Sequence, residues 1–195
     1  MTDKHFLALS GSLRHSSHNT GLLRALQALA PAGVTVELHP GLGALPFFGQ
    51  DLEEGPAPAA VAELRQRVKA ADGLLIATPE YNSAIPGVLV NALDWLSRPS
   101  EEHQTPVLRD KPTAILGASP SRFGTARGQL VLRQILHRTQ SRVVAHPEVT
   151  VFESHRRFAA DGSFVHDDFT DSLLRALLAE LVLLTELTER HSHTS

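Results

Sequence analysis

The sequence predicts an α/β fold in which helices cover both faces of a parallel, doubly wound sheet. Two observations support this prediction. Short apolar runs typical of buried strands alternate along the chain with segments whose apolar residues recur at helical spacing. Three of these runs also end in small polar residues before the next helix, in residues 10–19, 79–87 and 117–128. The ends of parallel strands meet at one edge of a sheet, so these three loops predict one ligand site.

The expected strands are short and mainly aliphatic, which is typical of strands buried on both faces. In chain order they cover residues 6–9, 34–38, 73–77, 113–116 and 143–151. The second strand shows alternating polar and apolar residues. The last one is interrupted by Pro147, which cannot donate a backbone hydrogen bond.

The expected helices follow the strands and show amphipathic spacing. They cover residues 21–30, 61–70, 88–96, 130–136 and 171–189. Pro31 ends the first of them, and the last carries a wide stripe of leucines. Residues 41–58 are rich in glycine and proline and predict a loop, in which Leu45, Phe47 and Phe48 pack onto the protein body or onto a partner.

Composition and charge exclude several classes of function. A chain of 195 residues with 42% hydrophobic residues suits a single domain over residues 1–195. The formal net charge of −3 favours neither nucleic acid nor an anionic membrane, and no segment has the length of a membrane span. No signal-like segment precedes the first strand, so we expect a cytoplasmic protein. The chain has no cysteine, which excludes disulfides and thiolate chemistry, and its histidines lack metal-site spacing.

The first loop has the residues of an anion site. Hydroxyl, amide and guanidinium groups and free backbone N–H groups precede a helix, whose dipole favours negative charge at that end. A bidentate contact from Arg14 suits a phosphate monoester. The loop lacks the glycine patterns of nucleotide and dinucleotide sites, so one terminal phosphate fits best. The alternative is an ordinary serine-rich turn in which Ser17 or Asn19 caps the helix.

The second loop, residues 78–87, combines two prolines with residues that tolerate unusual backbone angles, such as Asn82. A rigid loop of this kind can direct backbone amides toward a planar heterocycle, and the ring of Tyr81 can line that plane or cover a partner's edge. The alternative is a well-formed turn that starts a helix at Pro86.

Together these motifs resemble the NADPH-dependent FMN reductase family. The resemblance covers nearly the whole chain and is carried by residues 10–14 with Ser17 and Asn19, residues 79–82 with 86–87, 91 and 94–95, and residues 117–120, 124–125 and 133–136. It implies a flavodoxin-like, five-stranded parallel sheet of order 2-1-3-4-5 in three α/β/α layers. It further implies noncovalent FMN and the reduction of quinones, azo compounds or similar acceptors by NADPH or NADH, and a homodimer or homotetramer with flavin sites near the subunit boundaries.

The family's motifs also imply residue roles. The phosphate and ribityl chain would contact Ser10, Ser12, Arg14, Ser17 and Asn19. The isoalloxazine ring would lie along Pro79, Glu80, Tyr81, Asn82 and Ser83, with Ser119 near its far side. Hydride transfer through flavin needs no side-chain acid or base, so we assign no catalytic side chain. We expect ping-pong kinetics, because the hydride donor and the acceptor would use the same exposed face of the flavin. The chain departs from the family at Ala84, Val90 and Ser121, where members often carry Ser, Lys and Gly.

Other classes of protein fit less well. A receiver domain needs carboxylates after its first strand, where this chain has Ser10 and Gly11, and a small tyrosine phosphatase needs a cysteine. A flavodoxin-like electron carrier without a substrate pocket remains the main alternative, although carriers are usually strongly acidic and cover the ring with aromatic side chains. A flavin-free protein that senses NAD(P) is a third, weaker alternative.

Overall fold

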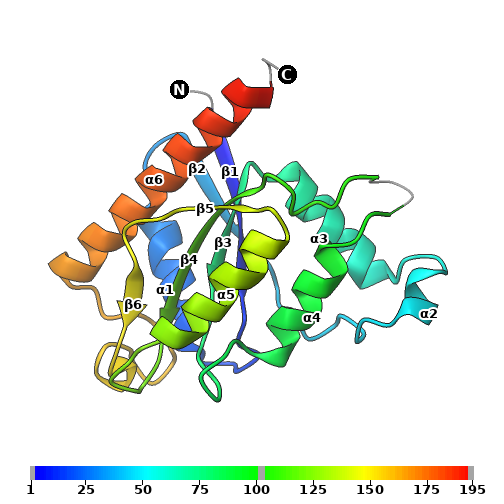
Figure 1. Ribbon diagram of the computed structural model, residues 1–195. Helices are drawn as coiled ribbons and strands as arrows, with labels where there is room; N and C mark the ends of the chain where they lie inside the picture. Colours follow the sequence, from blue (N-terminus) through cyan, green and yellow to red (C-terminus); the bar gives the residue numbers. More distant parts are fainter. Residues whose placement is uncertain (1–2, 101–103, 193–195) are drawn as a thin grey trace.

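The computed structural model describes residues 3–100 and 104–192, and its centre is one parallel sheet (Figure 1). The strands follow the order β2-β1-β3-β4-β5, as predicted, and β6 pairs with the last residues of β4, after the part of β4 that pairs with β5. Their bounds are β1 Lys4–Ser10, β2 Val34–Leu38, β3 Gly73–Ala77, β4 Pro112–Ala118, β5 Arg142–Val143 and β6 Val149–Val151. The carboxyl ends of β1, β3 and β4 lie side by side, because each of these strands pairs with the next in parallel register.

Helices cover both faces of the sheet and form three layers. On one face lie α1, His18–Ala28, and α6, Asp168–Ser192; on the other lie α3, Ala59–Ala70, α4, Gly87–Leu96, and α5, Ala126–Arg138. Alternate residues of β1 point into the two cores: Phe6 and Ala8 pack with α1 and α6, and Leu7 and Leu9 with the other helices. Both cores are fully buried at β1, which explains its continuous apolar run.

The fifth strand differs from the prediction. Residues 143–151 do not form one strand but contribute to two short ones, β5 and β6, so the sheet has six strands and not five. Pro147 lies between them and has no N–H group for a ladder, so the segment leaves the sheet after Val143 and rejoins it at Val149. Both strands pair with β4, at its beginning and at its end respectively.

The glycine- and proline-rich segment contains one short helix that was not predicted, α2, Gln50–Glu53. Leu45 packs against the core, and the ring of Phe48 meets Trp95 edge-on at 5.0 Å. Asn91 holds this segment, because its side chain accepts from Phe48 N at 2.7 Å and donates to Pro46 O at 3.0 Å. Phe47 is 81% exposed and does not pack on the body. Within the described residues, no helix is long and apolar enough to cross a membrane.

Candidate functional site

The loops that follow β1, β3 and β4 meet at the carboxyl edge of the sheet, which lies at the bottom of Figure 1. Gly11 N donates to Ala77 O at 2.8 Å, and Thr78 N donates to Leu116 O at 3.0 Å, so each loop is tied to the neighbouring strand. Gly117 lets the second and third loops approach closely, because a Cβ atom there would overlap Thr78 O and Thr125 Oγ1. The three predicted loops therefore form one continuous surface.

Serine hydroxyls shape the first loop. Ser10 Oγ accepts from Ser12 N at 3.3 Å and from Thr20 Oγ1 at 2.9 Å, and Ser12 Oγ accepts from Arg14 N at 3.3 Å. Ser17 is the N-cap of α1, since its side chain accepts from Thr20 N. The capping role considered from the sequence is thus correct for Ser17, and it extends α1 to begin at His18 and not at residue 21.

The start of α1 suits an anion. Within the part of the chain that the structure describes, the backbone N–H groups of Ser16, Ser17, His18 and Asn19 have no protein acceptor. Unpaired N–H groups at a helix start attract a negative group, and the helix dipole adds to that attraction. The residues present here fit a phosphate monoester.

Arg14 lies in this loop with its guanidinium folded back. Its Nε donates to Ser16 O at 3.1 Å, and its Nη2 donates to the same carbonyl. Because the side chain is exposed, it is free to exchange this carbonyl for a phosphate oxygen without disturbing the core. In the structure itself it braces the loop.

Asn19 lies inside the protein and faces the third loop. Its side chain is 3% exposed; Nδ2 donates to Ala118 O at 3.0 Å, and Oδ1 accepts from Ala118 N at 2.9 Å. The amide thus continues the ladder of β4 beyond the point where β3 ends. The structure gives the Asn19 side chain a positioning role, in which it joins α1 to β4.

The second loop is a tight turn that presents backbone donors. Tyr81 and Ala84 exchange two backbone hydrogen bonds of 3.0 Å, and the two residues between them, Asn82 and Ser83, have φ angles of 51° and 63°. Positive φ at both central positions defines a type I′ turn. Among the described residues, no protein acceptor lies on the backbone N–H groups of Glu80, Asn82 or Ser83. Such donors fit a planar ring that carries oxygen and nitrogen acceptors.

The Glu80 side chain turns away from that turn toward α5. Its carboxylate is 4% exposed, accepts from Gly128 N at 3.0 Å and pairs with Arg127 Nε at 2.7 Å. This contact caps the start of α5, where Thr125 makes no side-chain cap. Only the backbone of Glu80 therefore remains available to a ligand. Pro79 is buried beside it, and Tyr81 is 53% exposed.

Hydrogen bonds within the third loop and to the end of β6 hold its conformation. Ser119 Oγ accepts from Ser121 N at 3.2 Å, and Ser119 N donates to Val151 O at 3.0 Å. The hydroxyl of Ser121 donates to Gly124 O at 3.2 Å, so this departure from the family pattern is absorbed by the loop's own turn. Ser119 is 8% exposed and directly follows β4.

A fourth segment, not predicted from the sequence, contacts the first and third loops. His18 Nδ1 lies 2.8 Å from Ser154 Oγ, and the His18 ring stacks on Phe158 with centroids 4.5 Å apart. Ser154 N in turn donates to Ser119 O at 3.1 Å. Burial lowers the pKa of His18, and the charges of Arg14 and His155 lower it further. The segment has no periodic pattern that could have indicated this contact.

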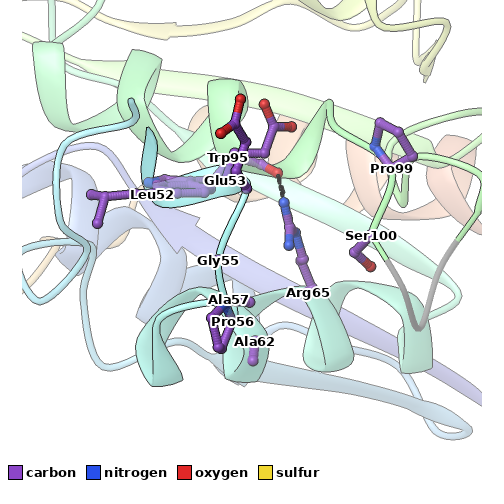
Figure 2. A pocket seen from close by; sticks show the side chains of 11 residues that line it. Leu52, Glu53, Gly55, Pro56, Ala57, Ala62, Arg65, Trp95, Pro99 and Ser100 are labelled. Carbon is purple, nitrogen blue, oxygen red and sulfur yellow. Dashed lines mark hydrogen bonds between the residues drawn. The ribbon is translucent and has the colours of Figure 1, made fainter. Parts of the chain in front are cut away.

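A separate cavity of about 270 Å³ lies between α2, α3 and α4, and Figure 2 shows the side chains that line it. Arg65 lies in it, 5% exposed, and donates from Nε and Nη2 to Trp95 O at 3.3 and 3.0 Å. This contact fastens the end of α4 to α3. None of the residues that line the cavity belongs to the three loops, so the cavity lies outside the candidate site.

Comparison with known proteins gives consistent results. The model of the NADPH-dependent FMN reductase family matches residues 5–156. The chain is 40% identical over 177 residues to an NAD(P)H-dependent FMN reductase of Pseudomonas aeruginosa, covering 91% of this chain and 93% of the relative. It is 39% identical over 158 residues to a 2-hydroxy-1,4-benzoquinone reductase of a Burkholderia species, with 81% and 84% covered.

Among solved structures, the chain resembles FerB, a flavoenzyme NAD(P)H:(acceptor) oxidoreductase of Paracoccus denitrificans. The TM-score is 0.80 at 32% identity, over 96% of this chain and 98% of the other. The flavodoxin-like architecture expected from the motifs is therefore found both in the sheet order and in the structural neighbour.

Proposed function

Because the chain belongs to the NADPH-dependent FMN reductase family, and is therefore an oxidoreductase that uses FMN and NAD(P)H, we propose that it passes hydride to quinones, azo compounds or similar acceptors at the three joined loops. The observation that carries this proposal is the set of backbone N–H groups on the first two loops that have no acceptor among residues 3–100 and 104–192. One set suits a phosphate and the other a ring, as FMN requires.

The residue roles in the proposal follow the geometry. Ser10, Ser12, Arg14 and Ser17 with the start of α1 hold the phosphate and ribityl chain, and Asn19 positions that helix. The backbone of residues 79–83 lines the ring, and Ser119 lies toward its far side. When bound, FMN supplies the ring that accepts hydride and passes it on, while the protein orients it. No side chain is assigned a proton transfer.

An enzyme needs an open ring face, which an electron carrier does not. The only tryptophan, Trp95, is 1% exposed and donates from Nε1 to Pro46 O at 2.9 Å, so it cannot cover a ring at the loops. This favours the reductase over the carrier. With one open face, the hydride donor and the acceptor must bind in turn.

Steady-state kinetics test this mechanism. Double-reciprocal plots of NADPH or NADH oxidation with a benzoquinone acceptor are expected to be parallel, because each substrate leaves before the other binds. Intersecting lines would indicate separate sites and contradict the alternating mechanism. If NAD(P)H fails to bleach the bound flavin in stopped flow, the carrier alternative replaces the reductase.

Binding measurements test the phosphate site. Replacing Arg14 by Ala removes a charge-assisted contact worth about 1.5–3 kcal/mol, so FMN affinity should fall roughly 10- to 150-fold. Riboflavin, which has no phosphate, should bind equally to both forms. Arg138→Ala, an exposed arginine in the last turn of α5, serves as the matched control. Equal losses for riboflavin and FMN would mean that Arg14 only braces the loop through Ser16 O.

The proposal also includes a single domain over residues 1–195, a homodimer or homotetramer and a cytoplasmic location. Association would cover three exposed apolar side chains, Leu13 at 56%, Phe47 at 81% and Phe123 at 65% exposure. Sedimentation equilibrium measures the assembly; a monomer at micromolar concentration would contradict this part. The location is supported by the use of NAD(P)H, an intracellular metabolite.

A further inference from the structure

Lys111 lies at the amino edge of the sheet, immediately before β4 and on the side opposite the three loops. Its Nζ donates to Ala71 O at 2.6 Å, where α3 ends. The residue is partly buried, while Ala71 is 2% exposed. The ammonium group thus lies in the protein surface and not in free solvent.

This amine has no carboxylate partner at close range. Within residues 3–100 and 104–192, no carboxylate oxygen lies within 4.0 Å of Lys111 Nζ. The nearby Asp72 carboxylate accepts from His5 N at 2.7 Å instead. Lys4 gives the contrast, because its Nζ pairs with Glu189 Oε1 at 2.5 Å. A partly buried ammonium that lacks an ion pair is less stable than one that has one.

Lys111 is one of the residues that line a surface pocket of about 390 Å³. The charged groups that line it with Lys111 are Asp72, Arg109, Asp110 and Glu189. Burial lowers the pKa of Lys111 to about 8, and the charge of Asp72 opposes part of that change. At pH 7 roughly a tenth of such an amine is uncharged, compared with well under a thousandth for an ordinary lysine. An uncharged amine is a nucleophile.

We propose that Lys111 is a modification site, which small acyl phosphates acylate in preference to the other lysines. In this step Nζ attacks the acyl carbon, the bond from that carbon to the phosphate oxygen breaks, inorganic phosphate leaves, and the amine proton goes to solvent. Arg109 lies in the same pocket, with its Nε bound to Gln140 Oε1 at 2.7 Å, and its guanidinium attracts the dianionic leaving group. The product is an uncharged amide.

The chain offers its own controls because it contains only three lysines, Lys4, Lys69 and Lys111. The full-length protein is incubated with acetyl phosphate at pH 7, and mass spectrometry of its peptides gives the rate at each lysine. Lys111 should react at least about tenfold faster than the exposed Lys69, because the larger uncharged fraction of its amine outweighs the weaker nucleophilicity of a less basic amine. The ion-paired Lys4 should react more slowly than both. Equal or faster acetylation of Lys69 would overturn the proposal.

Two further measurements separate chemistry from exposure. The rate at Lys111 should rise with pH and level off above about pH 8; a rate that continues to rise to pH 10 contradicts a reactive amine at this position. Arg109→Gln should slow acetylation by acetyl phosphate several-fold and leave acetylation by a neutral N-hydroxysuccinimide ester unchanged. If both reagents slow equally, the variant has changed the pocket, and the preference for acyl phosphates is wrong.

Discussion

Replacing Asn19 by Ala tests whether this residue positions the site or contacts the ligand. The side chain makes two hydrogen bonds, of 3.0 and 2.9 Å, to the backbone of Ala118, which is itself 2% exposed. The substitution leaves a buried C=O and a buried N–H without partners, and each costs about 1–3 kcal/mol. We expect the free energy of unfolding to fall by about 2–4 kcal/mol. In a chain of this size, that lowers Tm by roughly 5–15 °C.

The measurement is urea unfolding followed by circular dichroism, on protein freed of FMN so that ligand binding does not add stability. Asn82→Gly is the matched control. Asn82 is an exposed residue of the second loop with a φ of 51°, a conformation that glycine adopts without strain. Removing its side chain should therefore change the free energy of unfolding by no more than about 0.5 kcal/mol.

The FMN titration of the same variants decides between the two roles. If Asn19→Ala leaves the stability of the FMN-free protein unchanged and weakens FMN binding, the residue is a direct contact and the positioning role is refuted. If Asn19→Ala already lowers the stability of the FMN-free protein, the positioning role is supported, in which the side-chain amide binds the backbone of Ala118.

Three further changes follow from the same site. Gly117→Ala should destabilise the protein by about 2 kcal/mol or more, since its Cβ overlaps Thr125 Oγ1; thermal unfolding within 2 °C of wild type would contradict this close approach. The pKa of His18 is lowered in the folded state, so the folded state binds fewer protons than the unfolded one, and the free energy of unfolding falls as the pH drops below 6.5. In urea titrations at pH 5 to 7.5, His18→Phe should make the free energy of unfolding depend less on pH. An unchanged pH dependence excludes His18 as its source. Glu80→Gln should weaken FMN binding and lower Tm together, because the cap of α5 loses its charge. If FMN binding weakens while Tm is unchanged, the Glu80 carboxylate contacts the ligand directly.

Local patterns in the sequence were sufficient for the strands, the long helices and the three loops. Apolar runs and helical spacing are properties of neighbouring residues, and even the break in the fifth strand is marked by Pro147. The roles of Asn19 and Glu80 could not be found in this way. Their partners lie 99 and 48 residues away along the chain, and only the folded sheet brings them together. The family motif names both residues as flavin contacts, which stays a prediction, and it does not indicate that their side chains bind Ala118 and the start of α5.

The short helix α2 and the contact of His18 with Ser154 were missed for a related reason. A helix of four residues is too short to show a period, and residues 152–158 follow the sheet edge with no alternation. Tertiary contacts select the conformation of both segments. Phe47 was expected to pack on the protein body or on a partner. It is exposed and does not pack on the body, so packing on a partner stays a prediction.

The contact between Glu80 and the start of α5 has a consequence for the entropy of ligand binding. The turn that follows Glu80 is closed by its own two backbone bonds and anchored by a buried carboxylate, so its donors are aligned before any ligand arrives. A preorganised turn loses little conformational freedom when a ring docks against it, so more of the contact energy appears as affinity. The same anchoring makes α5 sensitive to the ligand: a displacement of the turn would pull the carboxylate from Gly128 N and loosen the first turn of a helix that packs against β4.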